Sequence, residues 1–334
     1  MAIAGAPPVV VAGGDALSPR TRLLLEGPVA PTLLRLAAPN VLVMVLQAAV
    51  STLDAVFVGW LGSDALAGVS LVFPLVMLMQ TMSAGGMGGG VASAVARALG
   101  AGRRSDADAL VLHALVIAVV IAACFTLSLE LGGRALYRTM GGSGGVLDAA
   151  VLYSRVVFGG AIAYWLFNTL GSVVRGTGNM VLPASVMVAS GLIYLVLSPA
   201  LILGWGPLPR LGIAGAATAS VASFGLGSLA LLGFLLSSRS LVRPRLRGLR
   251  LRGRFFREIL RVGAPGSLNT VLTNLTVVLL TSLVGPFGAT ALAGYGMGAR
   301  LEYLQIPIVF GLGSGLVTMV GTSVGAGDRA RALR

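Results

Sequence analysis

Eight long apolar stretches run along this chain, separated by short polar or glycine-rich segments. They cover roughly residues 33–60, 66–91, 110–131, 150–173, 182–204, 212–236, 258–284 and 290–320. A helix needs about 20 predominantly apolar residues to cross a lipid bilayer, and each stretch reaches that length. The pattern therefore predicts an all-α polytopic membrane protein with eight transmembrane helices.

Part of this pattern occurs twice. Residues 34–102 contain LRLAAPN, VGWLGSDALAG and LGAG, and residues 260–327 contain LRVGAPG, VGPFGATALAG and VGAG, at an offset of 226 or 225. Six predicted helices separate equivalent positions, and an even number gives both copies the same orientation in the membrane. The sequence thus predicts a parallel internal repeat, which in transporters places a binding cavity between the two halves.

The repeat divides the chain into four expected segments. These are a disordered cytoplasmic leader (1–31), a first six-helix bundle (32–238), a basic cytoplasmic linker (239–257) and the first two helices of a second bundle (258–334).

Composition and charge agree with a membrane protein. Only 10% of the residues are charged, whereas a soluble domain carries about 25%. The net charge of +13 comes from arginines between apolar spans, so we expect no nucleic-acid partner. Nine arginines lie in residues 239–261, whereas the loops on the other side hold only Arg134, Arg138 and Arg210. The positive-inside rule places both termini in the cytoplasm of a bacterium, with the protein in the inner (plasma) membrane. The linker then lies against anionic lipid or binds a specific lipid or partner.

An ordered set of motifs resembles the multidrug and toxic compound extrusion (MATE) family. The motifs are LDAVFVGWLGSDALAGVSL, SAGGMGGG, VARALGAGRRSDA, VVRGTGN, LGWGPLPRLGIAGAATAS and ARLEYLQIPIVFGLGSG. The resemblance runs from about residue 33 to the last residue. It implies twelve helices in two bundles around a central cavity, and export of small organic, often cationic, molecules in exchange for H⁺ or Na⁺. No other cofactor and no resident metal is implied.

Two features depart from that family. The sequence stops after the eighth predicted helix, so we expect a chain short of the last four, either inactive in transport or completed by assembly with another chain. The family's fifth helix often carries Asn and, four residues later, Asp before Pro, and the matching positions here are Tyr194 and Ser198. A flippase for lipid-linked or polysaccharide precursors is an alternative with the same architecture.

Intramembrane carboxylates are the first candidates for an ion-coupling site, because a charged Asp at mid-helix costs about 2.5–3.5 kcal/mol and usually faces a cavity. Asp54 shares one predicted helical face with Asn40, Gln47 and Ser51, at spacings of 7, 4 and 3 residues. This stripe predicts a cavity wall, with a fixed hydrogen-bonded Asp as the alternative. Asp54 also matches the first-helix Asp of the family, and Glu302 matches its eighth helix, where a structural ion pair is the alternative.

The remaining candidates are weaker. Thr218 matches a family Thr that could supply an oxygen to a cation, although a hydroxyl bond to its own backbone is commoner. Ser198 is a weaker ion-coupling candidate than Thr218. Polar side chains inside predicted spans could contact substrate or serve only in packing; these are Asn168, Asn269, Asn274 and Tyr194. Pro39 and Pro265 occupy equivalent positions and are hinge candidates or fixed kinks.

The sequence favours transport over catalysis. It has no paired-carboxylate, triad, nucleotide-binding or metal-binding constellation, so no catalytic residue is proposed and no enzyme activity is expected. Because the fifth-helix carboxylate is missing, the sequence favours H⁺ over Na⁺ as coupling ion, since Na⁺ needs several oxygen ligands and a proton needs one buried carboxylate.

Overall fold

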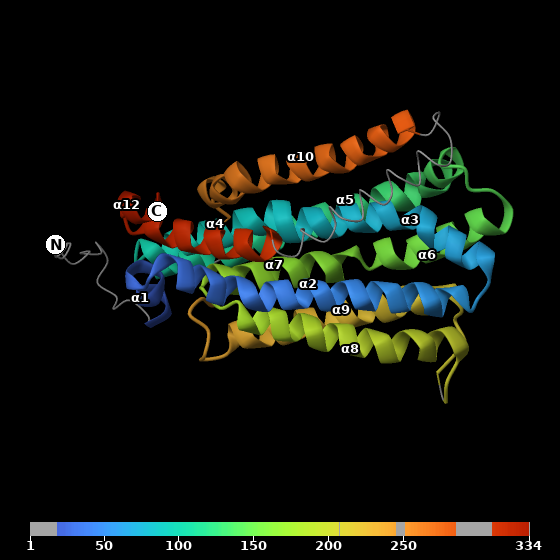
Figure 1. Cartoon of the computed structure of the whole chain (residues 1–334), viewed down its shortest axis with the longest axis horizontal. Helices are drawn as coiled ribbons and strands as arrows, with labels where there is room; N and C mark the ends of the chain where they lie inside the picture. Colours follow the sequence, from blue (N-terminus) through green and yellow to red (C-terminus); the bar gives the residue numbers. More distant parts are fainter. Residues whose placement is uncertain (1–18, 207, 245–250, 285–308, 334) are drawn as a thin grey trace.

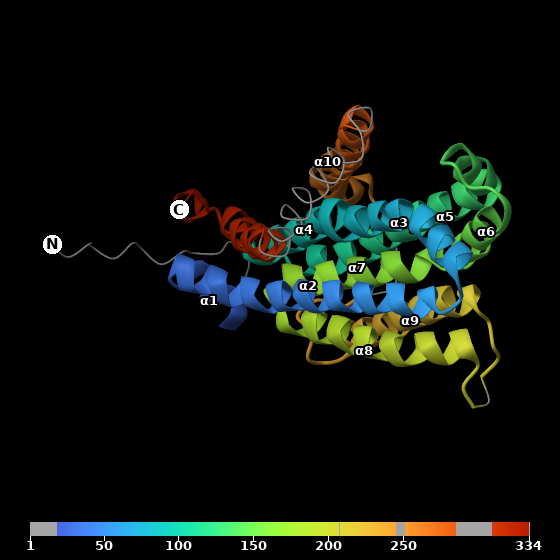
Figure 2. The same cartoon turned by 45° about the vertical axis from the view of Figure 1, so that its right-hand side comes forward.

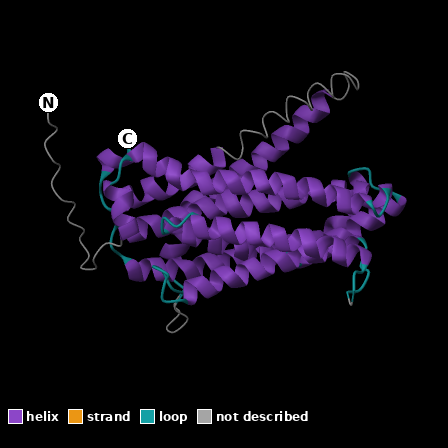
Figure 3. Cartoon of the chain, turned by 60° about the horizontal axis from the view of Figure 1, so that its bottom comes forward, coloured by secondary structure: helices purple, strands orange, loops and turns teal. Residues whose placement is uncertain are grey.

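The chain forms a bundle of long helices that run in nearly parallel or antiparallel directions (Figure 1). The structure, a computed structural model, describes residues 19–206, 208–244, 251–284 and 309–333. Every regular element in these ranges is helical (Figure 3). The elements are α1 (Pro19–Glu26), α2 (Val29–Gly59), α3 (Ser63–Thr81), η1 (Met82–Met87), α4 (Gly88–Gly100), α5 (Arg104–Thr139), α6 (Gly144–Gly159), α7 (Ala161–Gly176), α8 (Val181–Leu203), α9 (Ile213–Leu236), α10 (Gly253–Val284), the helix Val309–Gly325 and α12 (Arg329–Ala332).

Among these residues, five helices are long and apolar enough to cross a membrane, and α6 with α7 makes a sixth if the bent pair is one span. The prediction of eight spans is therefore supported only in part. α10 covers the seventh predicted stretch but is not one of these helices, and only the end of the eighth stretch is described. α3, η1 and α4 follow one another without a break, as one span over residues 63–100.

Two local features differ from the pattern's expectation. Part of the expected disordered leader is helical, because α1 buries Leu24 and Leu25, and Leu24 packs with Met180 and Met319. The fourth predicted span is two helices bent by 45° at a break next to Gly160. The Thr126 hydroxyl donates to the Phe158 carbonyl at 2.5 Å, which satisfies a backbone acceptor beside the break, as a non-aqueous surrounding requires.

α7 is the central helix of the first bundle. It packs against α4, α5 and α9, while α8 pairs with α9 and α3 pairs with α6. Tyr164 and Trp165 of α7 are fully buried, and Phe167 packs edge-on against Phe224 of α9. The packing around α7 fixes the positions of the helices that carry the candidate polar residues.

Glycines bring the first bundle and α10 into backbone contact. η1 is a π-helix of sequence MSAGGM, and the Ser83 hydroxyl donates to the Gln80 carbonyl at 3.0 Å. A Cβ atom at Gly86 would lie 2.5 Å from the Ser267 nitrogen, and one at Gly90 would lie 2.6 Å from the Gly263 nitrogen. Only glycine allows helices to approach this closely, and small residues at such crossings are typical of membrane helices.

A second set of contacts joins the halves at the end of the bundle that holds α1 and α12 (Figure 1). We call this the basic end, because Arg97, Arg104 and Arg175 also lie there. The Asn40 amide donates to the Ser314 hydroxyl at 2.8 Å. The Arg331 guanidinium donates to the Leu24 carbonyl at 2.9 Å and the Gly27 carbonyl at 2.5 Å. Away from this end α10 rises from the bundle (Figure 2), so the described halves meet at the basic end and diverge toward the other.

The described part of the predicted linker is fastened to the start of α5. The Arg243 amide donates to Asp108 at 2.8 Å, and the Arg104 guanidinium donates to the Leu241 carbonyl at 2.7 Å. His113 is buried, and its Nε2 accepts from the Arg252 amide at 3.0 Å. Residues 253–257, expected in the linker, already belong to α10 because the apolar Phe255 is buried against the bundle.

The crossing of η1, α4 and α10 gives a direct test of the fold. Gly90→Ala should destabilise the folded protein by about 1–3 kcal/mol, because the new Cβ atom overpacks the backbone of α10. Gly89→Ala is the matched control, because a Cβ atom at Gly89 meets nothing within 4 Å. The measurement is thermal unfolding in detergent, and equal midpoints for the two variants would contradict the crossing.

Candidate functional site

Asp54 is held by a tyrosine from a distant helix. Asp54 lies near the end of α2, and the Tyr194 hydroxyl of α8 donates to its Oδ1. Asp54 is half-buried, Tyr194 is almost fully buried, and the buried Ser198 hydroxyl donates to the Tyr194 oxygen over a long 3.5 Å. The structure thus brings together three of the candidates that the sequence placed on two different helices.

Magnitudes show that this bond alone does not fix the charge of Asp54. A hydrogen bond to a charged group contributes about 1.5–3 kcal/mol, whereas a charged Asp at mid-helix costs about 2.5–3.5 kcal/mol. The two ranges overlap, and Asp54 lies near the end of α2 rather than at its middle. The charged and neutral forms of Asp54 are therefore close in free energy.

Two further tyrosines belong to this cluster, and the sequence analysis missed them. Tyr153 of α6 and Tyr164 of α7 are both buried and within electrostatic range of Asp54. The Tyr164 hydroxyl is hydrogen-bonded to the Ser220 hydroxyl of α9 at 2.5 Å. A signal was present, because a tyrosine inside an apolar span needs a polar partner for its hydroxyl, but no pattern paired either residue with α2.

The rest of the polar stripe on α2 is only partly explained. Asn40 is buried and bonds to Ser314 across the two halves, so it joins helices rather than lining an open cavity. Gln47 is half-buried. The side chain of Ser51 lies outside the described part of the structure, as does Glu302.

The candidates on α7 and α9 make packing hydrogen bonds. The Asn168 amide donates to the Ser83 hydroxyl at 2.9 Å and to the Tyr164 carbonyl at 3.1 Å. The bond to Ser83 holds the π-helical segment η1 against α7. The Thr218 hydroxyl donates to the Ala214 carbonyl one turn earlier, at 2.7 Å, which is the commoner of its two predicted roles.

The candidates on α10 do not reach the Asp54 cluster in a described contact. The Asn274 amide donates to the Thr270 carbonyl at 2.8 Å, and Asn269 is exposed. Pro39 and Pro265 lie inside α2 and α10, as predicted. Pro265 lies beside the crossing with η1, because its neighbours Gly266 and Ser267 make that contact.

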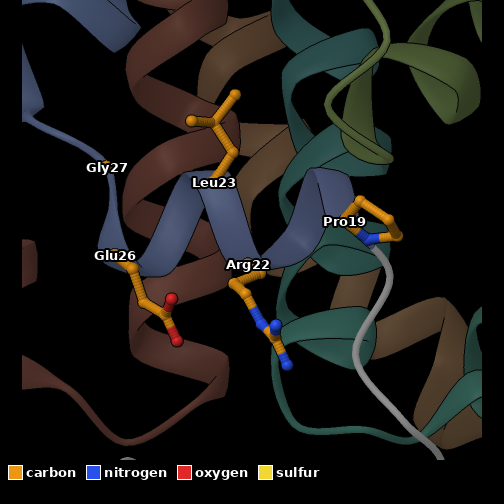
Figure 4. A pocket seen from close by; sticks show the side chains of 5 residues that line it. All are labelled: Pro19, Arg22, Leu23, Glu26 and Gly27. Carbon is orange, nitrogen blue, oxygen red and sulfur yellow. The ribbon is translucent and has the colours of Figure 1, made fainter.

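A surface depression of about 460 Å³ lies on α1, away from this cluster. Figure 4 shows its lining residues on one short helix and the turn after it; they are Pro19, Arg22, Leu23, Glu26 and Gly27. The Arg22 and Glu26 side chains both point outward from the helix (Figure 4), so the depression is part of the surface.

Comparison with known proteins decides the family. The MatE family profile matches residues 39–200 and 265–334, which include Asp54, Tyr194 and the crossing of η1 with α10. The chain belongs to the MatE family. The match covers parts of both halves of the chain, because its second segment begins at Pro265 of α10.

Individual relatives agree with this MatE assignment. The chain is 29% identical to a protein named "FAD transporter" from Shewanella oneidensis, over 92% of this chain and 68% of the relative. It is 32% identical to "Probable multidrug resistance protein YoeA" from Bacillus subtilis, over 87% of this chain and 63% of the relative. The chain therefore spans about two thirds of the length of these curated relatives.

Solved MatE structures share the fold. A MOP superfamily transporter from Pyrococcus furiosus superposes with a TM-score of 0.87 at 27% identity, covering 96% of this chain and 70% of that one. A crystal structure of MATE in complex with MaD3S superposes with a TM-score of 0.86, covering 95% of this chain and 71% of that one. The all-helical membrane fold predicted from the apolar pattern is confirmed at this level.

Proposed function

We propose that this chain is part of a proton-coupled antiporter that exports small organic molecules by alternating access. The observation that carries the proposal is the Asp54 cluster, in which a half-buried carboxylate on α2 is bound by Tyr194 and lies near two more buried tyrosines. A carboxylate in this position exchanges a proton when its surroundings change, because burial favours its neutral form and a hydrogen bond favours its charged form.

The oxygen atoms available as cation ligands around Asp54 support H⁺ over Na⁺ as the coupling ion. The cluster supplies one carboxylate, and its other oxygens are hydroxyl groups, of which Tyr194 already donates to Asp54. Ser198 stands where the family pattern often has an Asp, so it supplies a hydroxyl in place of a second charge. A hard cation is bound by several oxygen ligands at once, whereas a proton needs only the one carboxylate present.

Close contacts between the halves support the predicted parallel repeat. A Cβ atom at Gly100 would clash with the Thr322 carbonyl, and one at Gly325 would clash with the Arg97 carbonyl. The repeat offset of 225 relates Gly100 to Gly325 and Arg97 to Thr322, so these two contacts are copies of each other. Reciprocal contacts of this kind arise at a two-fold axis.

The same relation holds for the flanking helices. Gly86 and Gly90 pack on α10 next to Ser267 and Ile259, while Gly311 and Gly315 pack on α2 next to Val41 and Leu33. The offset of 225 relates Gly86 to Gly311 and Gly90 to Gly315. The offset of 226 relates Val41 to Ser267 and Leu33 to Ile259. Alternating access then corresponds to a rocking of the two related halves against each other, with the basic end closed in the conformation described.

Orientation and substrate follow from the charge pattern and the relatives. The arginine bias predicts that the basic end and both termini face the cytoplasm of a bacterial inner membrane, so the described conformation opens outward. The names of the relatives include FAD and multidrug transport, and the family resemblance predicts organic, often cationic, substrates. We propose small organic molecules as the class.

The first test concerns Asp54. Asp54→Asn should abolish export of a fluorescent organic cation from cells while the protein still inserts in the membrane, because the amide cannot exchange a proton. Asp148→Asn is the matched control, since Asp148 is an exposed carboxylate paired with Arg134 at 3.3 Å. Export by Asp54→Asn at the rate of this control would refute the coupling role of Asp54.

The second test concerns the coupling ion. In proteoliposomes with the same fluorescent cation, an imposed pH gradient should drive uptake or release, and an imposed Na⁺ gradient at constant pH should not. The physical reason is the single carboxylate at the Asp54 cluster. Transport driven by Na⁺ alone would overturn the preference for H⁺ and would require hydroxyl and carbonyl oxygens as the cation ligands.

A further inference from the structure

One exposed face of α10 has the layout of a lipid headgroup site followed by an acyl-chain track. Residues at spacings of three or four share one face of a helix. On α10 such a row begins with arginines and continues with apolar residues; it consists of Arg254, Arg257, Arg261, Ala264, Leu268, Leu272 and Leu275, all of them exposed. We call this row the α10 stripe.

From Arg257 onward, the α10 stripe lies on the side of the helix away from the first bundle. The residues of α10 that pack against α4 and η1 are Ile259, Gly263 and Ser267, and these lie on the opposite side of the helix by the same spacing rule. The side chains of Leu268 and Leu272 are 59% and 51% exposed. α10 as a whole rises from the bundle in Figure 2.

The row of residues on α2 that the repeat relates to the α10 stripe shows how exposed this face is in the first bundle. This argument rests on the parallel repeat of the proposed function. An offset of 226 relates the α10 stripe from Arg261 onward to Arg35, Ala38, Leu42, Leu46 and Ala49 of α2. All five are exposed, with Leu42 at 60% and Leu46 at 40%, although α3, α8 and α9 are packed around α2. In both copies the described helices therefore leave this face uncovered, as a lipid-facing surface requires.

The arginines at the start of the α10 stripe form a positively charged site that favours an anion. Arg254 pairs with Asp106 at 2.7 Å, and Arg103 shares the same carboxylate at 3.0 Å. Arg257 and Arg261 have no hydrogen-bond or ion-pair partner among the described residues. The guanidinium of Arg97 is repelled by both Arg261 and Arg103, and Glu258 is the acid that attracts it.

We infer that the α10 stripe binds an anionic phospholipid, with its phosphate on Arg257 and Arg261 and an acyl chain along the apolar residues. Charge complementarity selects an anionic headgroup, because anionic lipids concentrate at the cytoplasmic surface and attract basic residues there. The apolar part selects a lipid over a free anion. From Arg261 to Leu275 the helix rises about 21 Å, enough to accompany a chain through half of a hydrocarbon core of about 30 Å.

A lipid at this position would act on the joint between the halves. The stripe begins at Arg254, which ties α10 to α5 through Asp106, and it passes Ala264 beside the glycines that cross η1 and α4. Binding of the headgroup therefore stabilises the packing of α10 against the first bundle at the basic end.

The test is binding of a fluorescent phosphatidylglycerol to the purified full chain in detergent, followed by fluorescence polarisation. The unchanged chain should bind it more tightly than a fluorescent phosphatidylcholine. Arg257→Gln with Arg261→Gln should weaken phosphatidylglycerol binding about 25-fold, because each arginine near an anionic lipid contributes about fivefold in affinity. Neither substitution removes a hydrogen bond or ion pair to another described residue, and elution as a single species on size exclusion confirms folding.

The matched control is Arg20→Gln with Arg22→Gln, which removes the same charge from exposed positions on α1 at the same end of the molecule. It should leave phosphatidylglycerol binding unchanged. Equal weakening by both double variants, or equal affinity for the two lipids, would reduce the effect to general surface charge and overturn the site. Displacement of the lipid by inorganic phosphate at millimolar concentration would assign the arginines to a free anion and overturn the lipid. The assay involves no transport, so its failure is distinct from failure of the proposed antiport.

Discussion

The closest contacts between the two halves of this chain are glycine-mediated contacts of backbone with backbone, and the arrangement of the other features depends on them. Between membrane helices there is no hydrophobic driving force of the kind that folds soluble proteins, so association depends on close packing and hydrogen bonds. Gly90 against Gly263 and Gly100 against Thr322 supply the packing. Asn40 with Ser314 supplies a hydrogen bond across the same joint.

Most polar groups inside the bundle are fixed by partners, which makes Asp54 distinctive. Asn168 and Thr218 bond to neighbouring hydroxyl or carbonyl groups and thereby hold helices in place. Asp54 is instead a titratable carboxyl group whose bond to the Tyr194 hydroxyl links α2 to α8. In the proposed mechanism, protonation of Asp54 changes this bond and so couples the charge on α2 to the position of α8.

The apolar pattern predicted the fold well because spanning helices need length and hydrophobicity, and both can be read directly from the sequence. It made Asp54 a candidate for the ion-coupling site because an acid in an apolar span stands out, and the structure shows that Tyr194 contacts it. It predicted one continuous fourth span, whereas the structure bends at Gly160, since no pattern shows whether a glycine breaks a helix. It also missed Tyr153 and Tyr164, because their place near Asp54 depends on how α6 and α7 pack around α2, which periodicity within one helix does not contain.

The central claim is that the halves must part at the basic end during transport, and a reversible cross-link tests it most directly. Asn40→Cys and Ser314→Cys, in a chain whose native Cys124 is replaced by Ser, can be joined by a short bifunctional thiosulfonate, because these side chains are hydrogen-bonded at 2.8 Å. The measurement is efflux of a fluorescent organic cation before linking, after linking and after reduction. The account predicts that linking stops efflux and reduction restores it; full efflux by the linked protein would contradict it.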